Sequence, residues 1–192
     1  MRGRMGVVAV GLSVVLVFGA CTPGGAEPSG SDTSSATPMA SVSATPSSDP
    51  EMDALYAEAE QVFWRSLELR FQSEMQPQEN EFPEAELSEV LSDPYLSWVR
   101  GGYEYLKEQG WHAPEGLEPT VVVAPYPGAS RDGSVIALYG CMDTRQIPAL
   151  DSSGEVVSEG KLYRLELFFK YFDGQMKLFE GDSREMTECS IV

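Results

Sequence analysis

The sequence contains a single histidine, His112, and three cysteines, none of which forms a CxxC pair. Structural zinc sites and similar metal centres are built from closely spaced Cys and His ligands. The chain has no such spacing, so we expect neither a metal nor another cofactor. No Ser–His–Asp arrangement is evident around the one histidine, which argues against hydrolases of that kind.

Basic residues are also few. The chain carries 13 Lys and Arg against 30 Asp and Glu, for a formal net charge of −17. A surface of this sign repels nucleic acid and anionic lipid, so we expect no nucleic-acid partner. The acidic surface either attracts cations or basic partners, or simply keeps the protein soluble outside the cell.

No apolar run is long enough to cross a bilayer. Residues 5–20 are apolar apart from Ser13, which is shorter than the roughly 20 residues that a membrane-spanning helix needs. Arg2 and Arg4 precede the run, and small residues end it. This order is typical of an exported signal peptide.

The end of that run, Val17-Phe18-Gly19-Ala20-Cys21, resembles the lipobox of a bacterial lipoprotein, with Phe18 where leucine is usual. The resemblance implies that Cys21 carries a diacylglyceryl group and becomes the first residue after cleavage at residue 20. It places the protein at the cell membrane, lipid-anchored on the extracytoplasmic face. The alternative is ordinary secretion with a spare cysteine.

Residues 21–50 are dominated by Ser, Thr, Pro and Gly. Such a segment buries too little apolar surface to offset the entropy of ordering, so we expect a disordered tether. As a random coil it would hold its cargo about 30 Å from the membrane. Residues 51–192 then have the size of one domain.

Two helices begin with clear signals. Asp49 and Pro50 suit the cap and first position of a helix that ends near Pro77, and Asp93-Pro94 repeats the pattern for a helix that Gly110 stops. A short helix is predicted between them, over residues 83–91. The apolar stripe of the first helix comprises Leu55, Ala59, Val62, Phe63 and Leu67. Gly101 and Gly102, inside the later helix, indicate either a close approach to a sheet or a kink.

After His112 the residue pattern changes from one typical of helices to one typical of strands. We predict strands over residues 120–124, 135–142, 162–172 and 175–182, with Asp173-Gly174 as a two-residue hairpin turn. Residues 151–154 superficially resemble a calcium loop but lack its later ligands, and we interpret them as a turn. The order of elements predicts an α+β domain with helices packed on one face of an antiparallel sheet.

The hairpin fixes an expected register. It places Tyr171 opposite Met176 and Phe169 opposite Leu178 on the core face. It also places Phe168 opposite Phe179 on the outer face, where an exposed aromatic pair serves either as cross-strand stabilisation or as an interface, for example in a homodimer.

The chain resembles the NTF2-like, cystatin-like α+β proteins, and in particular small NTF2-like lipoproteins of actinobacteria. The features that carry this resemblance are the lipobox and tether, Tyr56, Ala59 and Phe63-Trp64 in the first helix, the segment 140–143, Asp173-Gly174, and the late Cys189. The resemblance implies a cone-shaped domain with a cavity between a curved sheet of four or more strands and the helices.

A disulfide is expected between Cys141 and Cys189. If Cys21 is lipidated, these two cysteines remain as a pair in an oxidising compartment, and the family's disulfide maps onto them. The register argues against a simple meander, because a strand lies between the two cysteines while a disulfide needs Cα atoms about 4.4–6.8 Å apart. The C-terminal tail must therefore cross over, or a bulge must shift the register.

Three functions remain open. The first is a non-catalytic binding or accessory domain of the cell envelope, with a small apolar ligand or an envelope protein as its partner. Its candidate pocket residues are Trp64, Tyr103, Phe169 and Tyr171, for which ordinary core packing is the alternative.

The second function is an isomerase or dehydratase of the kind that the resemblance implies, with Asp143 or His112 as the general base. The third is a protein–protein module or homodimer that uses the outer sheet face around Phe168 and Phe179. No catalytic motif selects the second over the others.

Overall fold

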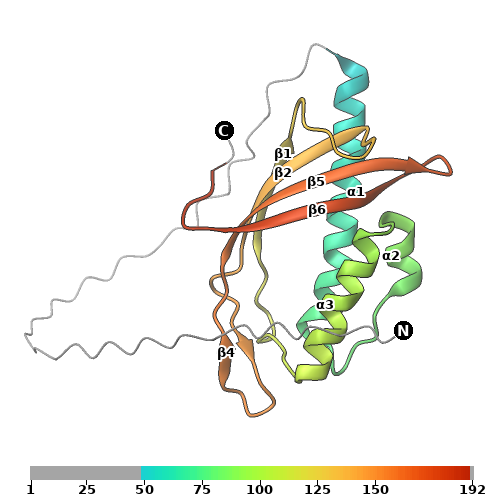
Figure 1. Ribbon diagram of the computed structural model, residues 1–192. Helices are drawn as coiled ribbons and strands as arrows, with labels where there is room; N and C mark the ends of the chain where they lie inside the picture. Colours follow the sequence, from blue (N-terminus) through green and yellow to red (C-terminus); the bar gives the residue numbers. More distant parts are fainter. Residues whose placement is uncertain (1–48, 191–192) are drawn as a thin grey trace, which may run out of the picture. The chain divides into compact units, whose positions relative to one another are not determined.

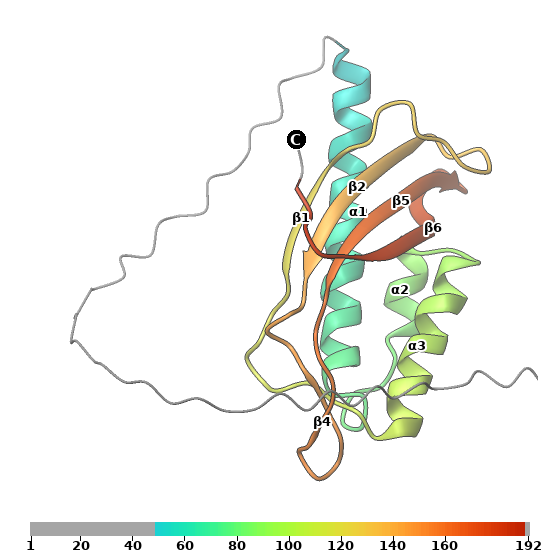
Figure 2. The same ribbon diagram turned by 60° about the vertical axis from the view of Figure 1, so that its left-hand side comes forward.

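The computed structural model describes residues 49–190. The expected signal peptide, Cys21 and nearly all of the expected tether lie outside the described residues. The described elements are α1 (Pro50–Met75), α2 (Glu84–Val90), α3 (Tyr95–Gln109), β1 (Thr120–Pro125), β2 (Ile136–Asp143), β3 (Ala149–Leu150), β4 (Val156–Ser158), β5 (Leu162–Phe172) and β6 (Gln175–Met186). Figures 1 and 2 show the helices together on one side of a strongly bent sheet. The α+β class is therefore confirmed.

The helix α1 begins where the sequence predicts. Asp49 Oδ1 accepts a hydrogen bond from the Glu51 amide at 3.0 Å, and Pro50 is the first helical residue. All five residues of the predicted stripe contact the core: Ala59 and Phe63 are fully buried, and Leu55, Val62 and Leu67 are partly buried against it. The fully buried face also includes three residues that were not predicted, Ser66, Leu69 and Ser73. The two buried serines donate to carbonyls of their own helix, at 2.8 Å for Ser66 and 3.0 Å for Ser73, so their burial leaves no hydroxyl unsatisfied.

The helices α2 and α3 also form at the predicted places. Asp93 Oδ1 accepts from the Ser97 amide at 3.2 Å, and Gly110 ends α3 in the left-handed region at φ 69°. Of the two alternatives for Gly101 and Gly102, the close approach to the sheet does not occur. Both glycines are exposed, and a Cβ placed on either would have nothing within 4 Å.

The main sheet is antiparallel in the order β1-β2-β5-β6, and β3 and β4 form a separate short pair around the turn at 151–154. The hairpin between β5 and β6 is confirmed: Phe172 pairs with Gln175, and Asp173 and Gly174 have φ of 50° and 81°. Two positive φ values in a two-residue loop match the twist of the flanking strands.

A β-bulge changes the predicted register further along this hairpin. Tyr171 faces Met176 and Phe169 faces Leu178, as predicted, but Phe168 faces Glu180 instead of Phe179. The extra residue in β6 is Phe179. A bulge of this kind bends the strand and increases its local twist, and the long strands β5 and β6 bend visibly in Figure 2.

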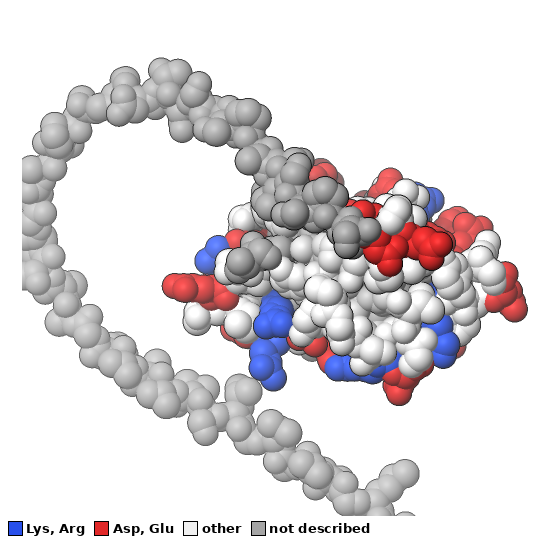
Figure 3. Space-filling model, turned by 90° about the horizontal axis from the view of Figure 1, so that it is seen from above, with Lys and Arg blue, Asp and Glu red and all other residues white. Residues whose placement is uncertain are grey.

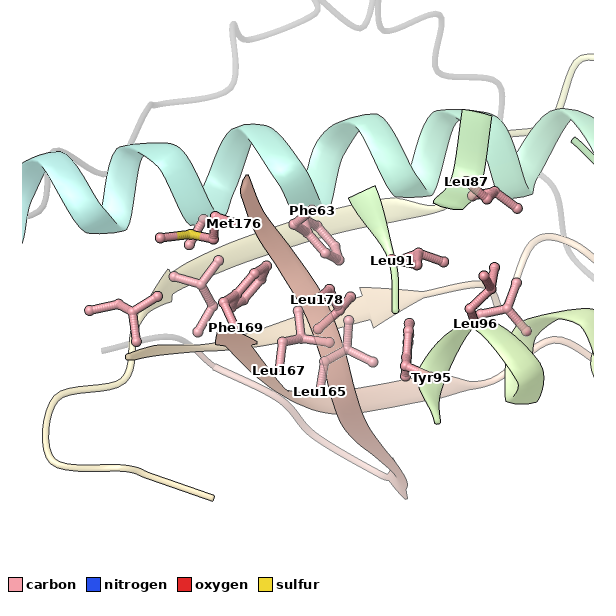
Figure 4. Packing of buried hydrophobic residues seen from close by; sticks show 14 of the residues in the cluster. Phe63, Leu87, Leu91, Tyr95, Leu96, Leu165, Leu167, Phe169, Met176 and Leu178 are labelled. Carbon is pink, nitrogen blue, oxygen red and sulfur yellow. The ribbon is translucent and has the colours of Figure 1, made fainter. Parts of the chain in front are cut away.

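The core lies between the helices and the inner face of the sheet. Figure 4 shows Phe63 of α1 near Phe169 and Leu178 of the sheet, with Leu91 and Tyr95 closing the other side. Phe169 and Leu178 are at most 1% exposed. Burying an aliphatic or aromatic side chain of this size contributes about 1.5–3 kcal/mol, so this layer fixes the helices on the sheet.

The predicted disulfide between Cys141 and Cys189 is present, with a Cα–Cα distance of 5.9 Å. Leu138 and Met142 of β2 contact the core, so Cys141 between them points to the outer face. Cys189 follows the end of β6, and β5 lies between β6 and β2. The C-terminal tail therefore crosses over, which is one of the two solutions expected from the sequence.

Two surface properties complete the description of residues 49–190. None of the helices in this range is long and apolar enough to cross a membrane. Seen from above, acidic side chains lie at several places around the rim of the molecule, whereas uncharged side chains occupy most of the middle of that face (Figure 3).

Candidate functional site

A cavity with mostly apolar walls opens at the ends of α1 and α3, and we call it the mouth pocket. It has a volume of about 360 Å³, within the range of roughly 300–1,000 Å³ that is typical of ligand sites. Its lining is Leu67, Arg70, Phe71, Glu74, Met75, Leu106, His112, Ala113, Pro119, Met142, Thr144, Ile147, Pro148, Ala149 and Tyr163. Most of these side chains are apolar, and a few polar groups stand among them.

The local structure explains why these residues meet. The last two turns of α1 provide Leu67, Phe71 and Met75, which repeat every four residues on one helix face. Met142 of β2 and Tyr163 of β5 are paired neighbours across the sheet. The helix face and the strand pair form opposite walls.

The edge strand β3 closes the pocket from the side. The His112 amide donates to the Leu150 carbonyl at 2.9 Å, and the Leu150 amide donates back to His112 at 2.7 Å. This exchange fixes the chain after α3 against β3. Ala149, next to Leu150, thereby lines the pocket.

An ion pair stands at the rim of the mouth pocket. Arg70 and Glu74 lie one turn apart on α1, with Arg70 Nε 3.0 Å from Glu74 Oε1, and their side chains are only 19% and 26% exposed. Arg70 Nη1 also donates to the Tyr95 hydroxyl at 3.1 Å. Removing one partner of such a partly buried ion pair is destabilising, because the charge of the other partner is left without its counter-ion.

The charge state of Arg70 follows from these contacts. Burial by itself would lower the pKa of the guanidinium, but the negative charge of Glu74 and the hydrogen bonds to Glu74 and Tyr95 outweigh burial and raise that pKa. Arg70 therefore stays charged at any physiological pH and gives the rim a fixed donor group.

His112, one of the two candidate bases, lies in the mouth pocket. It is half-buried and lines the cavity together with Thr144 and Tyr163. Within residues 49–190, no side-chain hydrogen bond orients its imidazole. A general base is normally held by a second group, so His112 lacks one element of a catalytic arrangement.

Asp143, the other candidate base, does not line the pocket, although its neighbours Met142 and Thr144 do. Arg145 holds it: Asp143 Oδ1 accepts from the Arg145 amide at 3.0 Å and from Nε at 2.9 Å, and Oδ2 accepts from Nη2 at 2.6 Å. The Arg145 side chain first, and then its backbone amide, lower the pKa of Asp143 to about 2. A carboxylate of that pKa is a weak base, which argues against proton abstraction by Asp143.

The four aromatic residues suggested as pocket residues do not come together there. Phe169 lies in the core (Figure 4). Tyr103 is buried and donates to the Asn80 carbonyl at 2.7 Å. Trp64 is exposed on α1, and Tyr171 is exposed with its hydroxyl donating to Glu58 at 2.6 Å. For Phe169 and Tyr103 the core alternative holds, and none of the four lines the mouth pocket.

The suggested outer-face interface also needs correction. Phe168 and Phe179 are 3% and 5% exposed and form a second small core with Ala137, Tyr126, Ala129 and Phe172. The Arg131 guanidinium lies 4.6 Å from the centre of the Phe168 ring. These rings are therefore covered by the chain itself and are not available to a partner.

Sequence reasoning missed Arg70, Glu74 and Trp98. The spacing of Arg70 and Glu74 is that of a helical ion pair, which is a usable signal, but exposed pairs of the same spacing are common. Trp98 lies over Arg70, with its ring centre 5.7 Å from the guanidinium carbon. That contact joins α1 to α3, and because the two residues are far apart in the sequence, no local pattern predicts it.

Comparisons with known proteins identify no family. No family model matches the chain, and no curated protein matches it. Among solved structures, it is similar to the intermembrane space region of the chloroplast protein ARC6, with 14% identity over 73% of this chain and 100% of that chain, and a TM-score of 0.49. It is also similar to a de novo designed β-sheet protein, with 17% identity over 68% of this chain and 92% of that one, and a TM-score of 0.39.

Proposed function

We propose that this chain is an extracytoplasmic lipoprotein, anchored through Cys21, whose NTF2-like domain binds a small and largely apolar ligand in the mouth pocket without transforming it. The observation that carries the proposal is the pocket itself. It has apolar walls from α1, β2 and β5, and the partly buried, hydrogen-bonded Arg70–Glu74 pair lies at its rim. Apolar walls with few fixed polar groups are the usual composition of a binding site.

The arrangement of the elements supports an NTF2-like cone. Three helices cover one face of a bent four-stranded sheet, and the cavity opens at one end of this sandwich. The disulfide supports an oxidising, extracytoplasmic location, because disulfides are rare in the cytosol of most organisms. The anchor at Cys21 and the tether to residue 50 rest on the sequence alone.

The test is to identify what the pocket holds. The full-length protein is purified from the membranes in which it is expressed, and co-purifying small molecules are extracted and identified by mass spectrometry. Ala149→Trp fills the pocket from its edge strand, whereas Ala85→Trp adds the same ring on the exposed surface of α2. We expect the parent and Ala85→Trp to carry the same molecule and Ala149→Trp to lose it.

An empty parent protein, or equal loading of both variants, would overturn the proposal. Circular dichroism shows whether the two variants are folded. Loss of the ligand is attributed to pocket filling only if both variants keep the spectrum of the parent. A conservative second filling variant, Ala149→Phe, replaces Ala149→Trp if the larger ring unfolds the domain.

An isomerase or dehydratase is the second candidate, and one observation favours it: the His112 imidazole lines the mouth pocket. Such an enzyme would exchange a C–H proton of its ligand with solvent. Incubation of the identified ligand in D₂O should give no deuterium incorporation if the domain only binds. Incorporation that His112→Gln abolishes would establish the enzyme instead.

A further inference from the structure

A second hollow lies between α1 and α3, and we call it the notch. It has a volume of about 270 Å³ and is lined by Arg70, Glu74, Trp98, Val99, Gly102, Tyr105 and Leu106. It shares Arg70, Glu74 and Leu106 with the mouth pocket, but its other walls belong to α3 alone. It therefore adjoins the mouth pocket but has walls of its own on α3.

Helical spacing builds the notch. Trp98, Gly102 and Tyr105 lie at positions i, i+4 and i+7 of α3, which share one helix face. Seven residues advance the helix by about 10 Å, so the two aromatic side chains are two turns apart. Gly102 stands between them and contributes no side chain, and a Cβ there would meet nothing within 4 Å. The floor of the notch is thus left open.

The two aromatic side chains of the notch, Trp98 and Tyr105, are exposed, but each packs against another aromatic ring. Trp98 is 59% exposed, but its ring stacks on Tyr95 with centres 5.4 Å apart and lies next to the Arg70 guanidinium. Tyr105 is 51% exposed, and its ring meets Trp111 edge-on at 5.6 Å. Rings that are already fixed lose little freedom when they bind a ligand.

The polar base of the notch presents donors and acceptors side by side. Arg70 uses Nε and Nη1 for Glu74 and Tyr95, and among residues 49–190 no acceptor takes its Nη2. Glu74 accepts at Oε1, and in the same range no donor reaches its Oε2. Arginine can only donate, and an ionised glutamate can only accept.

We propose that the notch binds a neutral sugar ring of an oligosaccharide. A hydroxyl both donates and accepts, so neighbouring hydroxyls can satisfy Glu74 and Arg70 together. An anion would face Glu74 and the strongly acidic chain, and a cation would face Arg70. The braced rings of Trp98 and Tyr105 cover the apolar C–H face of such a ring. The notch adjoins the mouth pocket through Arg70, Glu74 and Leu106, but Trp98, Gly102 and Tyr105 line the notch alone.

The test uses two adjacent glycines as a matched pair. Gly102→Leu fills the notch, whereas Gly101→Leu adds the same side chain on the same helix outside the notch, and both positions have free space around a Cβ. Both variants replace a helical glycine and gain the same helix propensity. The parent and both variants are titrated with N,N′-diacetylchitobiose and with maltose, and tryptophan fluorescence and amide NMR shifts are followed.

We expect at least one of the two disaccharides to shift the Trp98 signals, Gly101→Leu to bind as the parent does, and Gly102→Leu to bind at least about tenfold more weakly. Failure of both sugars to bind the parent overturns the proposal, and so does binding that Gly102→Leu leaves unchanged. A blocked, uncharged tyrosine tripeptide is titrated in parallel. If it binds more tightly than either sugar, the notch is a peptide site and the sugar proposal is wrong.

Discussion

Cys141 on β2 and Cys189 beyond the end of β6 are joined by a disulfide although β5 lies between their strands. The bridge is possible because Cys141 points to the outer face and the tail turns back across that face. Cys189 Sγ also lies 3.9 Å from the Gly140 carbonyl oxygen. The covalent link therefore fixes the tail over the side of the sheet opposite the helices.

Removing this bridge should destabilise the domain without changing its core. The two cysteines are 48 residues apart, and closing a loop of that length contributes about 4 kcal/mol through the entropy of the unfolded chain. We expect Cys141→Ser/Cys189→Ser to lose a similar free energy of unfolding in urea titrations. A loss below about 1 kcal/mol, with the oxidised parent as reference, would contradict this role.

Replacing a glycine by alanine should have opposite effects on stability in the helix α3 and in the strand β2. Gly101→Ala should stabilise the domain by about 1 kcal/mol, because the residue is exposed on a helix with free space around it. Gly140→Ala should destabilise it by about 1–3 kcal/mol, because the new Cβ would lie 2.8 Å from the Val122 carbonyl oxygen and 2.9 Å from Val123 Cγ1. Thermal unfolding measures both. If the two substitutions changed the stability equally, the close packing described around Gly140 of β2 would be contradicted.

The parts of the fold that local chemistry dictates could be predicted from the sequence. Asp49-Pro50 and Gly110 mark helix ends through caps that involve only neighbouring residues. Asp173-Gly174 sets a turn and, with it, the pairing of Phe169 with Leu178. In each case, the deciding interactions span a few residues.

The rest depends on contacts between distant segments. Strict alternation places Phe168 opposite Phe179, but a bulge shifts the register, and Tyr126 and Arg131 from a distant loop contact these rings. Neither the bulge nor this loop contact can be deduced from the alternation of the two strands. The mouth pocket needs α1, α3, β2 and β3 to be assembled first. For the same reason, His112 was predictable as a residue of interest but not as a residue of this pocket.

The contact between Asp143 and Arg145 predicts a specific pH dependence. The pKa of Asp143 is lowered to about 2 from an ordinary 3.8, so its contribution to stability is complete above about pH 4 and is lost as the pH falls toward 2. Carboxyl NMR titration should find this low pKa. Arg145→Gln should return it toward 3.8, whereas Arg131→Gln, which removes the same charge next to Glu180 and Asp182, should leave it low. An ordinary pKa in the parent would rule out the contact.

The proposed anchor makes a prediction about mass and location. If Cys21 is the lipidated residue, intact-mass spectrometry of the membrane-extracted protein should show cleavage after Ala20 and a diacylglyceryl addition on Cys21. Cys21→Ser should leave the protein without lipid and release it from the membrane fraction. Ser41→Ala, in the same tether, serves as the control and should remain anchored. An unmodified Cys21 in the parent would reject the anchor.

The central claim is that the mouth pocket binds a ligand, and methionine-methyl NMR tests it most directly. Met75 and Met142 line the pocket, Met176 lies in the core at 3% exposure, and Met186 lies on the outer face near the tail. During titration with a total lipid extract of the expressing cells, the account predicts shifts of Met75 and Met142 while Met176 and Met186 stay fixed. Unchanged Met75 and Met142 signals, or shifts confined to Met186, would contradict it.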